Sequence, residues 1–186
     1  MEPSHVRDRG ETPPLGAVPD EQTVTPAGQP VRDLIAGVQV RSAVTHVDDR
    51  GELCEIYDPA WGVLPEPLVY VYQAMVRPGK TKGWILHREQ DDRLFVALGF
   101  IRIVLYDARA ESPTCGRLNE IFLSERNRGL VVIPRGVFHA VQNVGSFDAY
   151  YVNVPTRAYN HRAPDKLRLP PDTDQIPFSL TLRAGG

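Results

Sequence analysis

Residues 130–143 read LVVIPRGVFHAVQN, and the rest of the chain is organised around this stretch. Aliphatic residues lead into Pro134, an Arg135-Gly136 turn follows, and His139 lies within a second apolar run. Gly permits a positive φ, and Pro suits a position that needs no backbone donor. The pattern therefore predicts a β-hairpin. His139 is either an ordinary half-buried residue of this hairpin or part of a polar cluster inside a barrel.

Composition excludes several classes of function. The chain has 186 residues and a formal net charge of -2, which fits one domain with a substantial core. It carries no basic run, so a nucleic-acid partner is not expected. No window reaches the ~18 consecutive apolar residues of a membrane helix, and no apolar signal core is present, so we expect a cytoplasmic protein without a membrane partner. Cys54 and Cys115 are interpreted as free thiols.

The chain divides into an arm and an all-β domain. Residues 1–36 are rich in Pro, Gly and charged residues and are predicted to be disordered or loosely attached. Residues 37–186 form the predicted domain, with an irregular C-terminal wrap from about residue 155. Short apolar runs separated by turn signals predict roughly ten strands, at 38–47, 53–57, 68–76, 83–87, 94–98, 101–106, 117–123, 131–133, 137–142 and 149–154.

Five collinear motifs carry a family resemblance. The spacing Pro-x-Gly-x-x-His-x-x-x-Asn at 134–143 resembles the second motif of the cupin superfamily. Residues 107–116, DARAESPTCG, are similar to the Asp-x-Arg-x-x-Ser-Pro-Thr-x-Gly element of the dTDP-4-dehydrorhamnose 3,5-epimerase family. The other three motifs are Asp48 to Glu55, His87, and Tyr159 with Asp172 downstream. The resemblance implies a jelly-roll barrel of two antiparallel sheets, a homodimer and a nucleotide-diphospho-sugar substrate.

The resemblance also implies an epimerisation next to a ketone, which needs a base, an acid and a stabilised enolate. Imidazole is well suited to act as base at neutral pH, and His87 is the predicted base. Asp172 is predicted to orient it, with Asp174 as the fallback. Arg93 is predicted to face the developing oxyanion, and Tyr159 is a candidate proton donor. The resemblance implies neither a metal nor another cofactor.

The remaining predicted site residues would hold the substrate. They are Arg50, Glu55, Trp84, Glu89, Arg109, His139, Tyr151 and Asn153. Trp84 and Glu89 replace an Arg and a Gln of the family, and Asn153 stands where the family has its catalytic Tyr. Three interpretations follow: Tyr151 or Tyr159 supplies the acid, only one stereocentre is inverted, or the reaction differs.

Two rival functions use the same fold. A metal-dependent cupin, an Fe or Mn oxygenase or isomerase, would use His87, Glu89 and His139 as ligands. Arg93 counts against it, because a fixed cation next to a metal dication is unfavourable unless it is paired. The third function is a sugar-binding cupin without catalysis, which the missing Tyr favours.

Overall fold

The computed structural model describes residues 17–18, 20–28 and 30–181, and the chain falls into two compact units that meet at Asp33 and Leu34. In the first unit, the Val31 N–H donates to the Thr23 carbonyl at 2.9 Å, and Val24 bridges Pro30. The predicted disorder of residues 1–16 lies outside the described residues. The unit boundary is three residues earlier than predicted, because Ile35 is buried in the barrel core.

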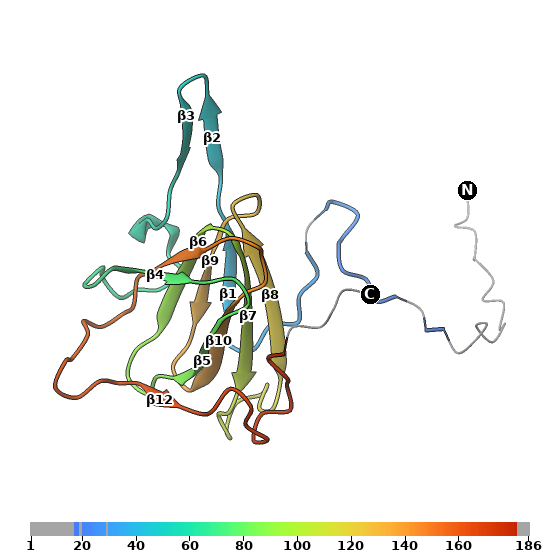
Figure 1. Ribbon diagram of the computed structural model, residues 1–186, viewed down its shortest axis with the longest axis vertical. Helices are drawn as coiled ribbons and strands as arrows, with labels where there is room; N and C mark the ends of the chain where they lie inside the picture. Colours follow the sequence, from blue (N-terminus) through green and yellow to red (C-terminus); the bar gives the residue numbers. More distant parts are fainter. Residues whose placement is uncertain (1–16, 19, 29, 182–186) are drawn as a thin grey trace. The chain divides into compact units, whose positions relative to one another are not determined.

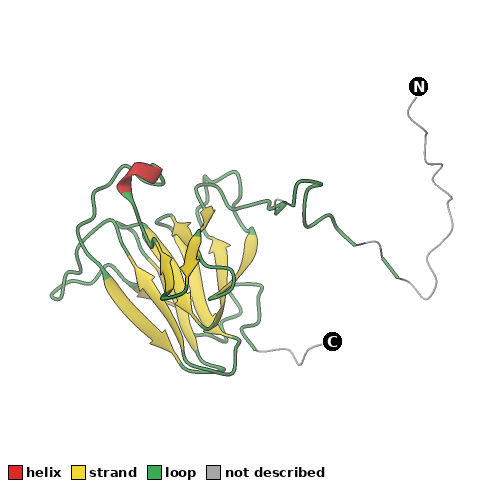
Figure 2. Ribbon diagram, turned by 90° about the horizontal axis from the view of Figure 1, so that it is seen from above, coloured by secondary structure: helices red, strands yellow, loops and turns green. Residues whose placement is uncertain are grey.

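The second unit is built from two five-stranded antiparallel sheets (Figures 1 and 2). The first sheet has the order β1 (Gln39–Ser42), β9 (Gly129–Ile133), β6 (Asp92–Leu98), β11 (Ala149–Asn153) and β4 (Tyr72–Val76). The second sheet has the order β12 (Leu167–Arg168), β5 (Thr81–Leu86), β10 (Val137–Asn143), β7 (Phe100–Asp107) and β8 (Leu118–Ser124). The predicted all-β jelly roll of two antiparallel sheets is thereby confirmed.

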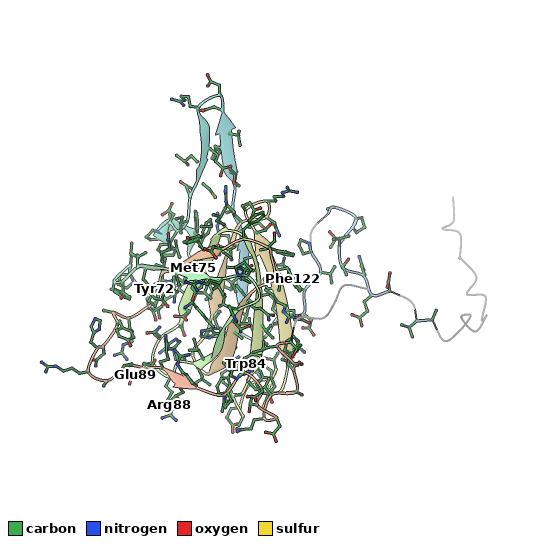
Figure 3. All side chains as sticks on the ribbon, in the orientation of Figure 1. Tyr72, Met75, Trp84, Arg88, Glu89 and Phe122 are labelled. Carbon is green, nitrogen blue, oxygen red and sulfur yellow. The ribbon has the colours of Figure 1, made fainter. Side chains whose placement is uncertain are left out.

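Strand alternation explains how the barrel is filled. Along β7, Ile101, Ile103 and Leu105 face the main core between the sheets, whereas Val104 packs in a second cluster on the outer face. Side chains crowd the interior of the barrel domain (Figure 3), whereas Trp84 belongs to the second cluster, on the outer face. The C-terminal residues Ile176 and Leu180 join the second cluster, so this sheet is covered on both faces.

The structure differs from the predicted hairpin at 130–143. β9 pairs with β1 and β6, whereas β10 pairs with β5 and β7, so the two strands lie in different sheets. The Pro134-Arg135-Gly136 turn therefore carries the chain across the barrel and does not close a hairpin. Gly136 has a φ of +80°, which favours glycine. A Cβ added there would also lie 2.8 Å from Arg109 Cγ, so both the backbone and the space require glycine.

Two predicted strands are divided or shortened in the structure, and one strand is additional. The strand predicted at 38–47 is split into β1 and β2 (Thr45–Asp48), and the strand at 68–76 is reduced to β4. The short strand β12 was not predicted; it pairs Leu167 with Leu86 at the sheet edge. β2 pairs with β3 (Gly51–Cys54) in a hairpin that projects from the barrel (Figure 1), and residues 48–51 form its turn.

Between these strands, residues 34–181 of the domain are connecting chain with a short 3-10 helix, η2 (Pro59–Trp61). Asp58 begins this turn, and its side chain accepts from the Ala60 N–H at 2.8 Å. Nearby, Val63 and Trp61 pack against the outer face of the first sheet. Across the described part of the chain, no helix is long and apolar enough to cross a membrane.

Candidate active site

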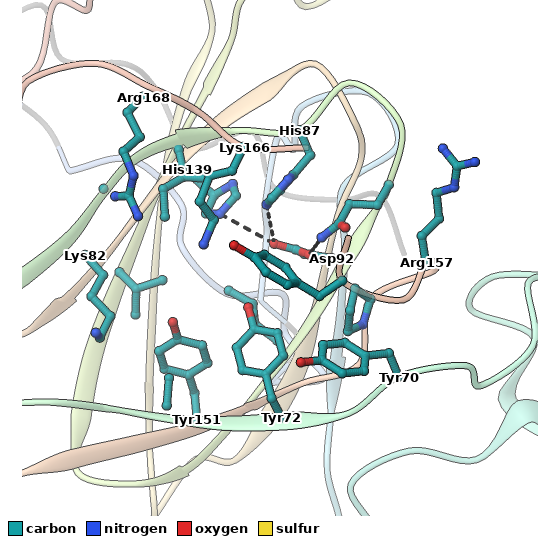
Figure 4. Close-up of a pocket in the computed structure, with 18 of the residues that line it drawn as sticks. Tyr70, Tyr72, Lys82, His87, Asp92, His139, Tyr151, Arg157, Lys166 and Arg168 are labelled. Carbon is teal, nitrogen blue, oxygen red and sulfur yellow. Dashed lines mark hydrogen bonds and ion pairs between the residues drawn. The ribbon is translucent and has the colours of Figure 1, made fainter. Parts of the chain in front are cut away.

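The candidate site is a cavity of about 540 Å³ between the two sheets (Figure 4). Strand β10 of the second sheet and the loop after β5 contribute imidazoles, and strands β4 and β11 of the first sheet contribute tyrosines. Its polar and charged lining residues are Tyr70, Tyr72, Thr81, Lys82, His87, Gln90, Asp92, His139, Tyr151, Arg157, Tyr159, His161, Lys166 and Arg168.

His87 is the most tightly positioned of these side chains. It follows β5, and its own carbonyl accepts the Gly136 N–H at 2.8 Å. Its Nδ1–H donates to the Asp165 backbone carbonyl, which leaves Nε2 as the unprotonated nitrogen of the neutral ring. Nε2 lies 3.5 Å from Asp92 Oδ2, and the side chain is almost completely buried. His87 is thus held in one tautomer with Nε2 at the cavity wall.

The loop after His87 is held by the Asp165 side chain. Its two carboxylate oxygens accept the N–H groups of Arg88 and Glu89 at 2.9 and 2.8 Å. Burial opposes ionisation of Asp165, but these N–H groups and the neighbouring His87 outweigh it and hold the pKa of the carboxyl below its usual range. Asp165 therefore positions His87 through both its backbone and its side chain.

His139 stacks on His87 with ring centroids 5.7 Å apart, and the Asp92 carboxylate lies against both rings. The distance from His139 Nε2 to Asp92 Oδ2 is 3.5 Å. Burial lowers the pKa of His139 to about 4, although the Asp92 charge opposes the shift. His139 is therefore neutral at neutral pH. Gln90 Nε2 donates to Asp92 Oδ1 at 2.9 Å and fixes the carboxylate.

Tyrosines form the opposite wall of the cavity. Figure 4 shows Tyr72 and Tyr151 with their hydroxyls directed toward the imidazoles. Burial raises the pKa of Tyr72 to about 12 and raises the pKa of Tyr151 further. Both phenols are therefore protonated at neutral pH. Tyr159 is 41% exposed and packs edge-on against His161, so it lies in a wetter part of the site.

Cationic side chains surround one side of the cavity. Lys82 is on β5, Lys166 immediately precedes β12, and Arg168 is in β12, so the pairing of these two strands brings the three together (Figure 4). Lys166 is half-buried, and burial lowers its pKa from the ordinary value. Arg157 lies on the other side of the site. This distribution suits an anionic ligand that is bound with its charged part outside the imidazole cluster.

Sequence comparison identifies the family. Residues 33–181 match the model of the dTDP-4-dehydrorhamnose 3,5-epimerase family, which is well over half of the chain. The chain belongs to this family. The predicted resemblance is therefore confirmed, and so is the prediction of an isomerase of the deoxysugar epimerase type.

Two curated relatives and one solved structure agree with this family. The chain is 33% identical over 146 residues to the spore coat polysaccharide biosynthesis protein SpsL of Bacillus subtilis, covering 78% of this chain and 96% of SpsL. It is 32% identical over 139 residues to the probable low-salt glycan biosynthesis epimerase Agl13 of Haloferax volcanii, covering 74% and 89% of the two chains. A dTDP sugar isomerase from Desulfovibrio desulfuricans superposes with a TM-score of 0.73 at 27% identity, covering 78% and 91%.

The fold is also that of ChmJ, a 3'-monoepimerase from Streptomyces bikiniensis solved with dTDP-quinovose. The two structures share 20% identity with a TM-score of 0.69, over 81% of this chain and 80% of ChmJ. At this identity the similarity concerns the fold alone.

Within this family fold, the structure places four of the predicted site residues around the cavity. His87, His139, Tyr151 and Tyr159 all line it. Asn153 is buried two residues beyond Tyr151 on β11, and its Nδ2 donates to the Tyr72 hydroxyl at 2.9 Å. Asn153 therefore acts on the cavity through Tyr72, not by lining it.

The structure contradicts the position predicted for Arg93. Arg93 is completely buried, but its Nε donates to the Val154 carbonyl at 2.6 Å, and its guanidinium lies over the Tyr57 ring at 4.7 Å. Successive residues of a strand face opposite sides of the sheet, so Asp92 faces the cavity and Arg93 faces away. Arg93 cannot face an oxyanion in this cavity.

Asp172 and Trp84 are also displaced from their predicted positions. Asp172, with Asp174, lines a separate groove formed by the C-terminal segment, and Asp165 contacts His87 in its place. The prediction of an Asp172–His87 pair is thus wrong for the described chain. Trp84 points to the outer face of its sheet and packs edge-on against Phe178, because Ile85 and Gly83 occupy the cavity side of β5.

The other predicted substrate-binding residues lie away from the cavity. Glu89 is exposed and pairs with Arg157. Arg50 is exposed in the β2–β3 hairpin and pairs with Asp48, and Glu55 is exposed just beyond the same hairpin. Arg109 instead braces Asp107 and the Ala36 carbonyl.

The carboxylate that lies with His87 and His139 is that of Asp92, and not that of Glu89 as predicted for a metal site. One donor atom each from His87, Asp92 and His139 lies within 4.8 Å of the others, and all three residues are buried. Sequence inspection missed Asp92, although a detectable signal existed. Every second residue of β6 faces the same side of the sheet. Leu94 and Val96 belong to the core, so Asp92 faces inward with them.

Proposed function

We propose that the chain epimerises a nucleotide-linked 4-keto-6-deoxyhexose at a carbon next to the ketone. One observation carries the proposal: His87 and Tyr151 project from opposite walls of one cavity (Figure 4). Inversion of a carbon requires that a proton leave one face and another proton arrive at the opposite face. A base and an acid on facing sheets supply this arrangement.

Each step can be written with its proton. His87 Nε2 takes the carbon-bound proton, and the bonding electrons move to the ketone oxygen to give an enolate. Tyr151 then donates its hydroxyl proton to the opposite face of the carbon, and the electrons return to re-form the ketone. The raised pKa of Tyr151 keeps this proton in place before the reaction. Solvent restores both side chains, so the reaction is redox-neutral.

Lys166 is the cation best placed to stabilise the enolate. It lines the cavity beside the imidazoles, whereas Arg93 points away. A cation that is held next to the reacting carbon stabilises the negative charge that develops on the ketone oxygen. The diphosphate of the substrate would lie against Lys82 and Arg168, since phosphate oxygens favour such cations.

Solvent exchange tests the proposal directly. The purified chain is incubated with dTDP-4-keto-6-deoxyglucose in deuterium oxide, and carbons 3 and 5 are followed by NMR. We expect deuterium at one or both carbons, with the pattern reporting how many centres are inverted. Tyr151→Phe should retain exchange but lose inversion, because abstraction by His87 survives. Absence of exchange in the unmodified protein would refute the function.

We also infer a homodimer, as the family resemblance implies, in which residues 38–47 would form the strand that crosses to the partner. Two features of the described chain support it: β1 is an edge strand of its sheet, and Val44, Val47 and Leu53 are exposed by more than 60%. Light scattering after size-exclusion chromatography tests the dimer. Val47→Glu with Leu53→Glu should give a monomer, and an unchanged mass would place the interface elsewhere. The cytoplasmic location remains a prediction.

A further inference from the structure

Three nitrogen and oxygen donors converge at the wall of the cavity. His87 follows β5, His139 is on the paired strand β10, and Asp92 opens β6 in the facing sheet. Their exposed fractions are 7%, 4% and 3%. Burying two imidazoles against a carboxylate is unfavourable unless the group is satisfied by a proton or a cation.

Hydrogen bonds behind His87 and Asp92 direct lone pairs of these two residues into the cluster. The Nδ1–H of His87 donates to the Asp165 carbonyl, so Nε2 presents a lone pair to the cluster. Asp92 Oδ1 accepts from Gln90, and Oδ2 is left to face both imidazoles (Figure 4). Metal-binding histidines characteristically donate their second ring N–H to a carbonyl or carboxylate, which fixes their tautomer and orientation.

The distances fit an ion better than they fit hydrogen bonds. Both Nε2 atoms lie 3.5 Å from Asp92 Oδ2. A good N–H···O bond spans about 2.7–3.2 Å. Ligand atoms about 2.1 Å from a tetrahedral Zn²⁺ would stand about 3.4 Å from one another.

The negative charge of Asp92 also suits the binding of a cation. Among the described residues, the ion-pair partners of Asp92 are His87 and His139. The argument from sequence against a metal rested on Arg93, but this guanidinium is turned to Tyr57 and Val154 on the other side of the sheet. The carboxylate charge is therefore available to a cation that enters from the cavity.

We propose that His87, Asp92 and His139 bind one divalent transition-metal ion such as Zn²⁺, and that the bound ion blocks the proposed reaction. Two imidazoles and one carboxylate favour transition metals over Mg²⁺, which prefers oxygen ligands. The ion takes the Nε2 lone pair that His87 needs to accept a proton. Binding does not depend on the proposed function, whereas the inhibition rests on it.

Cobalt provides a spectroscopic test of binding that is independent of activity. The full chain is stripped with a chelator and exchanged into metal-free buffer, and Co²⁺ is added while visible d–d absorption is recorded. We expect saturation at one Co²⁺ per chain and displacement by Zn²⁺ but not by Mg²⁺. Asp92→Asn and His139→Gln should each weaken Co²⁺ affinity at least about 100-fold. Asp148→Asn, an exposed acid outside the cavity, is the matched control and should bind normally.

The outcomes separate the metal site from the enzyme function. Circular dichroism first establishes that each variant is folded, and two different ligand variants protect against the failure of one. Absence of d–d bands, or unchanged affinity in both variants, would overturn the site even if solvent exchange is observed. If Zn²⁺ binds and exchange proceeds at its full rate, the blocking role is wrong. If Zn²⁺ binds and the metal-free chain shows no exchange, the proposed function fails while the site stands.

Discussion

Two buried carboxylates in this barrel have opposite surroundings. Asp107, at the end of β7, accepts from Arg109, Ser112 and Thr114 through bonds of 2.6–2.9 Å, so both of its oxygens are satisfied. Asp92 accepts one bond from Gln90, and its second oxygen faces two imidazoles at 3.5 Å. A carboxylate saturated by its own loop contributes to stability, whereas an incompletely satisfied one at a cavity wall is available for chemistry.

The largest expected effect lies at the incompletely satisfied cluster. His87→Asn should lower the rate of deuterium exchange by about 10³-fold or more, because the base is removed from a preorganised site. The free energy of unfolding should change by less than about 1 kcal/mol, since the amide can still donate to the Asp165 carbonyl. His46→Asn in the exposed hairpin is the control and should leave both quantities unchanged. Full exchange in His87→Asn would exclude His87 as base.

The saturated carboxylate should show the opposite behaviour. Asp107→Asn should lower the free energy of unfolding by about 3 kcal/mol, because the Arg109 guanidinium loses its charged partner and two hydroxyls lose an acceptor. Exchange per folded molecule should be unchanged. Urea titration and the deuterium assay measure the two quantities, and a loss of exchange without a loss of stability would contradict the comparison.

Acid should reduce this stability difference. Burial opposes ionisation of Asp107, but bonds from Arg109, Ser112 and Thr114 outweigh it and hold the pKa of the carboxyl well below its usual range. The stabilisation is therefore fully present above the unfolded-state pKa of about 3.9 and is lost as the pH falls toward the folded-state pKa. The difference in free energy of unfolding between the wild type and Asp107→Asn should become smaller below about pH 4. A constant gap between pH 7 and pH 3 would rule out this linkage.

Lys166 gives a smaller effect on catalysis. Lys166→Met should lower the exchange rate by about 10- to 100-fold, because the methionine retains the bulk of the side chain but cannot stabilise an enolate oxygen. Lys80→Met is the control, since Lys80 is exposed and does not line the cavity. Equal exchange rates for the two variants would mean that a group other than Lys166 stabilises the enolate oxygen.

The smallest effect is expected for the stability of Asp92→Asn. Removing this poorly paired charge should change the free energy of unfolding by less than about 1 kcal/mol, in contrast to Asp107→Asn. Urea titration of both variants in one buffer measures the contrast. A large destabilisation by Asp92→Asn would mean that both carboxylates have the same structural role.

The fold was predictable because the alternation of apolar residues is local. Nearly every predicted strand between residues 81 and 154 is present with small changes at its ends. The pairing of β9 with β10 was predicted wrongly, because a Pro-x-Gly turn has the same sequence whether it closes a hairpin or crosses between sheets. The distinction depends on long-range pairing, in this case β9 with β1 and β6.

The site was only partly predictable, for a related reason. His87 and His139 were found because their motifs fix both residue type and spacing. Arg93 and Asp92 are adjacent in sequence, and a change of one residue in strand phase exchanges which of them faces the cavity. Asp165 was missed because it lies 76–78 residues away in sequence from His87 and the loop that it holds, and no local spacing marks such a contact.

The crossing turn at Pro134-Arg135-Gly136 has a consequence for folding. The Arg135 N–H donates to Asp91 at 2.7 Å, and the Gly136 N–H donates to the His87 carbonyl at 2.8 Å, so one turn joins the loop that carries the base to both sheets. Neither sheet alone contains both the imidazoles and the tyrosines. Contacts of such long sequence separation form late, after much loop-closure entropy has been lost. During refolding, catalytic activity should therefore return with the docking of the sheets and not with the first strands.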